Sequence, residues 1–454
     1  MGDCYFLSSL SSIAENQNRI RKLFVTKQKN PYGLYCVRLC VMGEWQEIVM
    51  DDLFPCYNRR RGPCFTRGSG KELWVLLLEK AWAKIYGNYL RIEGGLTKEA
   101  LHNLTGAPAE TIFMSEERLW NTMIEGERHN WIMTCGSGSS VEGVNQLQKS
   151  GLVGSHAYSV LSAHNVQSHG RQIQLVKLRN PWGGTEWQGD WGDNSHLWTP
   201  ELKAQLHFQN IDDGIFFMDF NDFKKYFTDF QACYYYENYK YSCIKHRVAY
   251  NQPAYFEMKV TTPGDYYITV NQESKRKYPS ESGYKYSIVQ LVIGKQANNG
   301  GYEYYGSASK AWKEMWTKTT LTPGTYVVYV AIDWYQKNSR MFTLTSYGQN
   351  EVKFAPLQMG GKDFLEPVFK SRGRSVPEQK KKNYARYNEP NIYKATSFDD
   401  AYAFFYFDNR LGKATLVEDI SFREMEGLTF LPPYSGSNAK IEIRSEERRV
   451  GKEC

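Results

Sequence analysis

The hydrophobic pattern of this 454-residue chain changes along its length, and the change restricts the folds that the chain can adopt. Apolar residues recur at helical spacing over residues 5–24 and again over residues 72–85, which predicts two helices with buried faces. From residue 255 to about residue 347 the pattern becomes short alternating or aromatic strands, two of them introduced by Thr-Pro-Gly turns, which is typical of a β-sandwich. The sequence therefore predicts a mixed region of helices and strands followed by an antiparallel β region.

Size and composition favour several folded domains. A prior of roughly 150 residues per domain suggests about three domains for this length. Hydrophobic residues make up 41% of the chain, aromatic residues 15% and charged residues 23%, a balance that excludes a largely disordered protein. No run of about 18 apolar residues occurs, and the first residues contain no secretory signal, so the sequence predicts a soluble intracellular protein of the cytoplasm.

Charge and cysteine content exclude two further classes. The net charge of +7 comes from 56 basic and 49 acidic residues without a basic arm or a known nucleic-acid-binding motif, so nucleic acid is not expected as a partner. The nine cysteines lack the spacing of a disulfide scaffold or a zinc site, so most are predicted to be reduced thiols. Cys36 and Cys40 share a face of a predicted strand. We expect both to be buried there as small hydrophobic residues rather than to act as a pair of metal ligands.

Three short segments contain the residue types that nucleophilic catalysis requires: Cys4 in GDCYFL, His156 in SHAYSV and Asn180 in RNPWG. A thiol nucleophile needs a base within hydrogen-bonding reach, and the base needs a third group that fixes its orientation. Cys4 lies at the predicted start of a helix, where amide donors and the helix dipole favour the thiolate. His156 and Asn180 are expected on neighbouring strands of a second lobe that faces this helix. The order Cys, His, Asn indicates papain-like chemistry, although each residue alone would more often be structural.

These segments and the stretch EWQGDWGD at 186–193 resemble the signature blocks of the calpain family of cysteine proteases. Four further segments resemble calpain core segments in the same chain order, at 47–55, 71–86, 104–106 and 213–218. The resemblance covers the first half of the chain. It implies that Cys4 is the nucleophile, that His156 is the general base and acid, and that Asn180 orients the imidazole. It also implies that Trp182 shields the hydrogen bond between Asn180 and His156 from water.

The resemblance implies an α+β papain-like two-lobed protease core, followed by an antiparallel β-sandwich that is C2-like and by a partial second β-domain. The sequence RSEERRVGKEC at the C-terminus resembles the translation of a sequencing-library adapter and is expected to be non-native. The expected domains are a first protease lobe with the nucleophile helix at 1–145, a second lobe with His156 and Asn180 at 146–237, a C2-like β-sandwich at 245–350, a basic polar linker at 351–390, a partial second β-sandwich at 391–443 and the non-native tail at 444–454.

Calpain cores are switched on by calcium, so the resemblance also implies regulatory Ca²⁺ sites, which are built from several oxygen ligands. Glu186, Asp193 and Asp213 lie where the calcium-binding acids of the second lobe are expected, and Glu72 lies where the first lobe contributes one. Ile215 replaces an acid that the family often has, which predicts weaker binding at the second site. The alternative is that the four acids are ordinary surface or ion-paired carboxylates. No EF-hand loop motif occurs, so an EF-hand small subunit is not expected as a partner.

The start of the sequence departs from the family pattern. Calpain-like proteases place a Gln six residues before the nucleophile, where its amide stabilises the oxyanion, and an acidic calcium ligand about three residues further upstream. Both positions precede Met1, so we expect the chain to be an N-terminally truncated fragment. Loss of one oxyanion donor lowers the rate by about 100- to 1000-fold, so the chain as written is expected to be an impaired protease.

The sequence favours a calcium-dependent intracellular cysteine endopeptidase that makes limited cuts in protein substrates through a thioester acyl-enzyme. One alternative is a regulatory or scaffolding pseudo-protease that binds proteins or phospholipid through its β-sandwich domains and is recruited to membrane surfaces. The complete set of Cys4, His156 and Asn180 argues against it. Another alternative is papain-type or transglutaminase-like acyl transfer, against which the NPWG turn and the tandem Trp-Gly-Asp region favour the calpain type.

Overall fold

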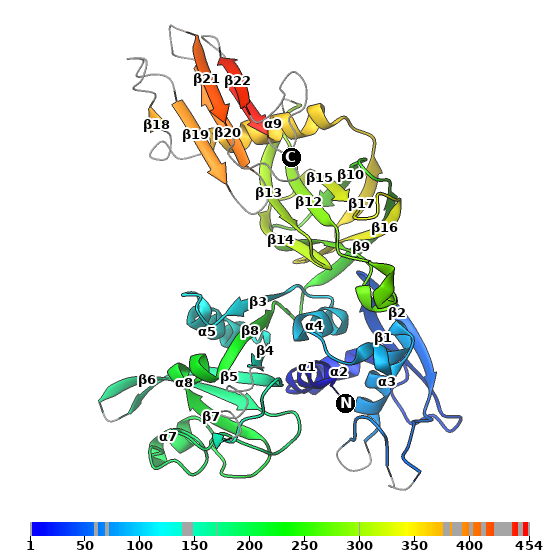
Figure 1. Cartoon of the computed structure of the whole chain (residues 1–454), viewed down its shortest axis with the longest axis vertical. Coiled ribbons are helices and arrows are strands. Elements are labelled where there is room, and N and C mark those ends of the chain that lie inside the picture. The colour runs from blue at the N-terminus through cyan, green and yellow to red at the C-terminus, as the bar shows by residue number, and fades with distance from the viewer. Residues whose placement is uncertain are drawn as a thin grey trace. The chain divides into compact units, whose positions relative to one another are not determined.

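A computed structural model divides the chain into two compact units (Figure 1). The first comprises Met1–Tyr239 and Arg276–Glu281, and the second comprises Lys240–Lys275 and Ser282–Cys454. The structure describes residues 2–58, 62–68, 72–138, 149–168, 170–298 and 300–375, together with the short segments 382–383, 393–398, 403–409, 415–421, 438–443 and 448–452.

The N-terminal part of the first unit is built around two helices that the sequence predicts. Helix α1 (Cys4–Ala14) buries the apolar side that the spacing of its residues indicates, and Phe6 stacks on Trp82 of α3 (Trp74–Tyr86) with ring centroids 4.8 Å apart. The other elements here are α2 (Gln17–Leu23), the hairpin of β1 (Leu34–Val41) and β2 (Glu44–Asp51), the 3₁₀ turn η1 (Tyr89–Ile92) and α4 (Thr97–Thr105).

The rest of the first unit is a six-stranded antiparallel sheet with the strand order β3-β8-β4-β5-β6-β7. Helix α1 packs against it, since Ser12 donates to the carbonyl of Met133 and Ser159 donates to the carbonyl of Ser8. The expected division at residue 145 stays a prediction, and the sheet draws strands from both sides of it. The bounds are β3 (Ala109–Phe113), α5 (Leu119–His129), β4 (Ile132–Ser137), β5 (Ala157–Ser168), β6 (Arg171–Arg179), α7 (Pro200–Gln205), β7 (Ile215–Asp219), α8 (Phe220–Tyr226) and β8 (Phe227–Cys233).

The second unit contains two antiparallel sheets that share one hydrophobic core. One sheet has the order β13-β12-β15-β10-β17 and the other β14-β11-β16-β9. Their inner faces contribute Phe256, Tyr266 and Leu344 to the common core, which agrees with the alternating pattern of the sequence. The bounds are β9 (Lys240–Val248), β10 (Ala254–Val260), β11 (Gly264–Asn271), β12 (Ile288–Gln296), β13 (Tyr302–Lys310), β14 (Glu314–Leu321), β15 (Gly324–Asp333), β16 (Arg340–Gly348) and β17 (Lys353–Leu357).

The polar linker expected over residues 351–390 is wrong for residues 353–374. Strand β17 pairs with β10, and helix α9 (Gly361–Arg374) follows it. Phe364, Val368 and Phe369 of α9 are buried against a second apolar cluster on the sheet that contains β10, β12 and β15. These three residues recur at helical spacing within a basic and polar stretch, and the burial of their side chains orders the segment.

The C-terminal strands form two small antiparallel sheets. One has the order β18-β19-β20-β23, and the other pairs β21 with β22. Strand β23 lies within residues 444–454, which the sequence analysis set aside as a non-native tail, and the origin of that tail stays a prediction. The bounds are β18 (Lys382–Asn383), β19 (Tyr393–Phe398), β20 (Ala403–Asp408), β21 (Leu416–Ser421), β22 (Asn438–Ile443) and β23 (Arg448–Lys452).

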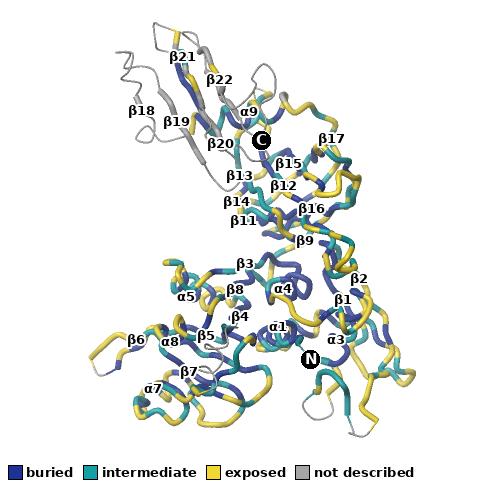
Figure 2. Tube along the Cα trace, in the orientation of Figure 1, coloured by how far each residue is buried: buried dark blue, intermediate teal, exposed yellow. Residues whose placement is uncertain are grey.

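Burial follows the cores of these sheets and the helices packed on them. Figure 2 shows the buried trace in dark blue along α1, α3 and the strands of the six-stranded sheet. Eight cysteines lie in the described part of the chain, and none of them forms a disulfide there. Cys40 is buried and Cys36 is half-buried on β1. Within the residues that the structure describes, no helix combines the length and the apolar character needed to cross a membrane.

Candidate active site

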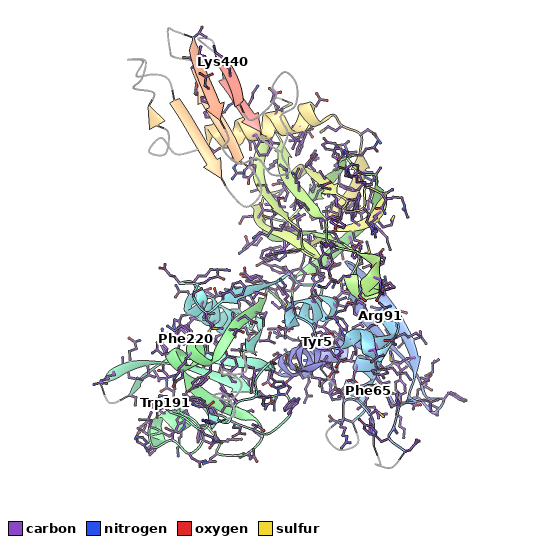
Figure 3. All side chains as sticks on the ribbon, viewed as in Figure 1. Tyr5, Phe65, Arg91, Trp191, Phe220 and Lys440 are labelled. Carbon is purple, nitrogen blue, oxygen red and sulfur yellow. The ribbon has the colours of Figure 1, made fainter. Side chains whose placement is uncertain are left out.

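Cys4 is the first residue of α1, as the sequence predicts. The first turn of this helix is closed by the carbonyl of Asp3, which accepts the backbone N–H groups of Phe6 at 2.9 Å and Leu7 at 3.1 Å. Tyr5, which is labelled in Figure 3, belongs to the first turn of α1. It fixes this end of the helix from the other side, because its hydroxyl donates to the carbonyl of Ile92 at 2.9 Å and accepts the indole N–H of Trp82 at 3.0 Å. The half-buried thiol of Cys4 is therefore held by a well-anchored first turn.

The environment of the Cys4 sulfur contains opposing influences. Burial raises the pKa of the thiol above its ordinary value, and the charge of Asp3 acts in the same direction. Hydrogen bonds from the backbone amides of Ala157, Tyr5 and Cys4 itself lower the pKa, but burial is the largest influence and the pKa stays raised. The resting sulfur is consequently a thiol at neutral pH, and a base must remove its proton before it can act as a nucleophile.

The side chains of His156 and Asn180 meet each other, and the residue after His156 contacts the Cys4 sulfur. His156 precedes β5 and Asn180 follows β6, and these two strands pair side by side. The two side chains are joined by a hydrogen bond of 2.9 Å between Nε2 of His156 and Oδ1 of Asn180, and both are buried. In the described part of the chain the Cys4 sulfur makes no hydrogen bond to the His156 ring itself. Its contact on that side is the amide of Ala157, the residue that follows His156.

The hydrogen bonds of Asn180 determine which nitrogen of His156 carries the proton. The Asn180 amide nitrogen Nδ2 donates to the carbonyls of Gly184 at 2.7 Å and Thr185 at 3.2 Å, so Oδ1 must be the atom that faces the imidazole. Oδ1 can only accept, and therefore Nε2 of His156 is the protonated nitrogen. Nδ1 of His156 is left as the basic nitrogen of the ring.

Trp182 covers this pair. Its ring centroid lies 4.3 Å from that of His156, and its backbone N–H donates to Oδ1 of Asn180 at 3.1 Å. Trp182 as a whole is 61% exposed, so this residue reaches the surface beside the buried His156, and its shielding of the hydrogen bond stays a prediction. Burial lowers the pKa of His156 below its ordinary value, and the hydrogen bond to Asn180 only partly offsets this. His156 is therefore a neutral base at neutral pH.

Three of the four acids that the sequence analysis assigned to calcium lie in one group in the second lobe. Oε1 of Glu186 accepts the backbone N–H groups of Asp213 at 3.0 Å and Gly214 at 2.6 Å. Burial, together with the charges of Glu186, Asp213 and Asp212, raises the pKa of Asp193 to about 6. Oδ1 of Asp193 is buried and has no hydrogen-bond partner among the residues that the structure describes. The group thus concentrates negative charge and leaves one buried oxygen unsatisfied, and its fourth member, Asp212, is an acid that sequence reasoning missed.

Glu72 has a different environment from these acids. It is exposed before α3, and its Oε2 accepts the indole N–H of Trp74 at 3.0 Å. Among the residues that the structure describes, no three His, Cys, Asp or Glu side chains are arranged closely enough to form a metal site by themselves. A cation at the second-lobe acids would therefore need backbone carbonyls or water to complete its coordination.

The two peptide groups on either side of the Gly214 Cα link the acids to Asn180. The carbonyl of Gly214 accepts the backbone N–H of Asn180 at 2.8 Å, while the N–H of Gly214 donates to Glu186. Gly214 has a φ of 86°, and a Cβ at this position would lie 2.8 Å from the carbonyl oxygen of Asn180. Only glycine fits here without strain.

Replacing Gly214 by alanine is expected to lower both stability and activity. The positive φ costs about 1–2 kcal/mol for a residue with a Cβ, and the contact with Asn180 adds about 1–3 kcal/mol. A displacement of about 1 Å at a catalytic group lowers the rate by on the order of 100-fold. Thermal unfolding and peptide hydrolysis measure the two effects.

Gly170→Ala is the matched control for Gly214→Ala. Gly170 has a similar φ of 74°, but a Cβ there meets no atom within 4 Å. It should show the backbone cost alone and keep the rate of the unmodified chain. Equal loss of activity in both variants would mean that the link through Gly214 does not position Asn180.

A thiol at a helix start, beside an imidazole whose tautomer is set by a buried amide, defines the site of a papain-like cysteine peptidase. The family described as "Calpain family cysteine protease" matches residues 1–234, and this chain belongs to the calpain family of cysteine proteases.

Curated relatives match over the same half of the chain. The calpain-type cysteine protease DEK1 of Zea mays is 36% identical over 244 residues, which are 51% of this chain and 11% of the relative. DEK1 of Arabidopsis thaliana is 37% identical over 246 residues, with the same coverage. The calpain-1 catalytic subunit of Rattus norvegicus is 32% identical over 243 residues, which are 51% of this chain and 34% of the relative. The match therefore spans only a minor part of these proteins.

Solved structures give weaker matches. A mitogen derived from Yersinia pseudotuberculosis matches 24% of this chain at 9% identity, with a TM-score of 0.18. This likeness is too low to bear on fold or function.

Proposed function

We propose that the chain is the catalytic part of a cysteine endopeptidase that hydrolyses peptide bonds in proteins through a thioester acyl-enzyme. The observation that carries this proposal is the hydrogen bond from Nε2 of His156 to Oδ1 of Asn180, because it leaves Nδ1 of His156 as the base. Membership of the calpain family supports a peptidase rather than an acyl transferase.

In the first half of the reaction, Nδ1 of His156 takes the proton from the Cys4 thiol. The thiolate attacks the carbonyl carbon of the scissile bond, and the carbonyl oxygen becomes an oxyanion. The backbone N–H of Cys4 at the start of α1 would stabilise that charge once the sulfur has bonded to the carbonyl carbon. The imidazolium then gives its proton to the amine nitrogen, the C–N bond breaks and the amine leaves, so that a thioester to Cys4 remains.

In the second half, water attacks the thioester while His156 accepts one of its protons. The second tetrahedral intermediate collapses, the C–S bond breaks and the carboxylic acid leaves. The proton on His156 returns to the sulfur, which restores the thiol. Asn180 keeps the ring oriented through both halves, and Trp182 keeps water from competing for the hydrogen bond between Asn180 and His156.

Capture of the acyl-enzyme tests this function. A peptide ester incubated with the chain and quenched in acid is expected to add the mass of its acyl group to the peptide that contains Cys4, as read by mass spectrometry. The adduct should decay when the folded chain is left at neutral pH before the quench, because water activated in the site hydrolyses the thioester. An acyl group found only on other cysteines, or on none, would contradict the proposal.

Calcium is proposed as a regulatory ion rather than a catalytic one. The second-lobe acids fit such an ion because they gather like charges and leave the buried Oδ1 of Asp193 without a partner. Glu186, Asp193 and Asp213 would hold it, with Glu72 contributing separately in the first lobe. A bound cation would supply positive charge that offsets their repulsion. Glu186 supports this assignment only in part, because its Oε1 already accepts hydrogen bonds from two backbone N–H groups.

Asp193→Asn is expected to abolish stabilisation by calcium. In the unmodified chain, added CaCl₂ should raise the unfolding temperature because the ion binds only the folded state. The variant should lose most of that increase, whereas Asp190→Asn, which removes an exposed charge from the same loop, should keep it. Unchanged calcium titrations in Glu186→Ala and Asp193→Ala variants would identify these acids as ordinary surface carboxylates.

We also propose where the enzyme acts and what its two-sheet domain binds. We place its substrates among intracellular proteins of the cytoplasm, cut at a limited number of sites. The two-sheet domain at 245–350 is proposed to be C2-like and to make contacts with proteins or phospholipid. Its shared antiparallel core supports a sandwich. Binding of the chain to vesicles with and without anionic lipid would test the lipid contact.

A further inference from the structure

Two buried carboxyl groups meet directly behind the catalytic cysteine. Asp3 is 3% exposed and Glu79 of α3 is 2% exposed, and the two side chains lie within hydrogen-bonding reach of each other. Glu79 also accepts the hydroxyl of Thr66 at 2.6 Å and the backbone N–H of Thr66 at 3.3 Å. Oδ2 of Asp3 is buried and accepts no hydrogen bond from any donor in the described residues.

This pair holds a proton at neutral pH. No ion pair in the described part of the chain reaches either carboxylate, so two ionised groups would repel each other without compensation. Burial and the neighbouring Asp3 raise the pKa of Glu79 to about 8, and the hydrogen bonds from Thr66 offset only part of this. Tyr89 is the other titratable group that faces Glu79, and it stays neutral because burial and the Glu79 charge raise its pKa to about 12. Protonated Glu79 therefore provides the donor that Oδ2 of Asp3 otherwise lacks.

The pair also explains an unusual helix start. Asp is among the preferred residues before a helix because its carboxylate accepts an amide of the first turn. Asp3 occupies that position before α1, yet its side chain makes no such bond. The Tyr5 N–H, which a capping carboxylate would bind, instead hydrogen-bonds to the Cys4 sulfur.

We propose that Glu79 is a positioning residue for Cys4. Protonated Glu79 donates a hydrogen bond to Oδ2 of Asp3, and this bond holds the Asp3 carboxylate away from the start of α1. The Tyr5 N–H then remains available to the Cys4 sulfur. A released Asp3 would compete with the sulfur for that amide and bring its negative charge to the helix end. Both effects disfavour the thiolate. This role rests on the proposed function of Cys4 as the nucleophile.

The alkylation rate of Cys4 tests the proposal without any requirement for peptidase activity. The chain is treated with iodoacetamide from pH 5 to pH 10, and the peptides that contain Cys4 and the exposed Cys243 are quantified separately by mass spectrometry. Cys243 lies in the second unit and reports the intrinsic reactivity of the reagent.

Three variants separate positioning from general structural damage. Glu79→Gln keeps a donor toward Asp3 and should alkylate at Cys4 within about threefold of the unmodified chain at pH 7. Glu79→Ala should slow alkylation by about 10- to 100-fold, the value of one hydrogen bond to a charged acceptor. Asp3→Ala combined with Glu79→Ala should restore the rate, because the competing carboxylate is gone.

The pH profile gives an independent measure of the shared proton. Above about pH 8, alkylation of the unmodified chain should fall behind that of Glu79→Gln, whose side chain does not ionise. The unfolding temperature should respond as well. An unfolded Glu loses its proton near pH 4.5, whereas the folded chain keeps it up to about pH 8, so unfolding releases a proton between these values. Stability relative to Glu79→Gln should therefore be highest below pH 4.5 and fall as the pH rises toward 8.

Distinct results overturn distinct statements. An unchanged Cys4 rate in Glu79→Ala, or a double variant slower than Glu79→Ala, overturns the positioning role. If Glu79→Ala does not fold, the proposal is tested by comparing Glu79→Gln with the unmodified chain. Alkylation rates and unfolding temperatures that change with pH in parallel in these two chains would show that Glu79 does not hold a proton at neutral pH. A chain that shows all the expected alkylation rates but forms no acyl-enzyme contradicts the proposed function alone.

Discussion

Cys4→Ala is expected to abolish peptide hydrolysis, with a loss of at least about 1000-fold in kcat. Alanine cannot form the thioester, and neither His156 nor Asn180 can replace it as a nucleophile. The fold should persist because Cys4 is only half-buried and its sulfur bonds to amides of its own helix start and of Ala157. Cleavage of a fluorogenic peptide measures the loss of hydrolysis, and near-UV circular dichroism with thermal unfolding measures whether the fold persists.

Cys36→Ala provides the comparison for this variant. Cys36 is also a half-buried free thiol, but it lies on β1 and has no contact with the site. Its replacement should leave the rate within about twofold of the unmodified chain. Turnover that survives in Cys4→Ala would show that the chain cleaves peptides by other means, or that a contaminating peptidase is responsible, and the assignment of the nucleophile would then be wrong.

His156→Ala is expected to lower kcat/KM by about 100- to 10,000-fold, the usual contribution of a general acid and base. It should also change the pH profile. In the unmodified chain, activity should fall at low pH as the imidazole becomes protonated. Because burial lowers the pKa of His156, that fall should lie below pH 6.5. The fall should be missing from any residual activity of the variant.

His164→Ala separates this effect from a simple loss of a buried ring. His164 is a partly buried histidine further along β5, and its pKa is likewise lowered by burial. Its ring hydrogen-bonds to Ser162 and takes no part in the site. This variant should retain both the rate and the fall at low pH. The role of His156 would be disproved by a rate that does not change in His156→Ala.

The sequence predicted where Cys4, His156 and Asn180 lie in the fold because each of these residues has a local signal, while their catalytic roles stay predictions. Cys4 precedes a run of apolar residues at helical spacing, and α1 begins at that residue. His156 and Asn180 border strands whose residue types are strongly β-forming, and the ladder between β5 and β6 brings them together. Such signals depend on neighbours in the chain, which a reader of the sequence can see.

The features that the sequence did not predict depend on contacts between distant segments. Glu79 lies beside Lys80 in the run LLLEKAW, where charged residues among apolar ones normally face solvent, and only the meeting with Asp3 and Thr66 reveals its burial. Asp212 is adjacent to a predicted ligand, yet its effect on Asp193 arises only when the loops come together. Helix α9 was missed because its three buried residues are outnumbered by polar ones.

The backbone of Gly214 connects the acidic loop with Asn180, which binds the imidazole. Glu186 accepts the N–H of Gly214, and the carbonyl of Gly214, which belongs to the next peptide group, accepts the backbone N–H of Asn180. The side chain of Asn180 also donates to the carbonyls of the two residues before Glu186. A displacement of the acids therefore reaches the ring of His156 through a few hydrogen bonds and one glycine, without movement of a whole lobe.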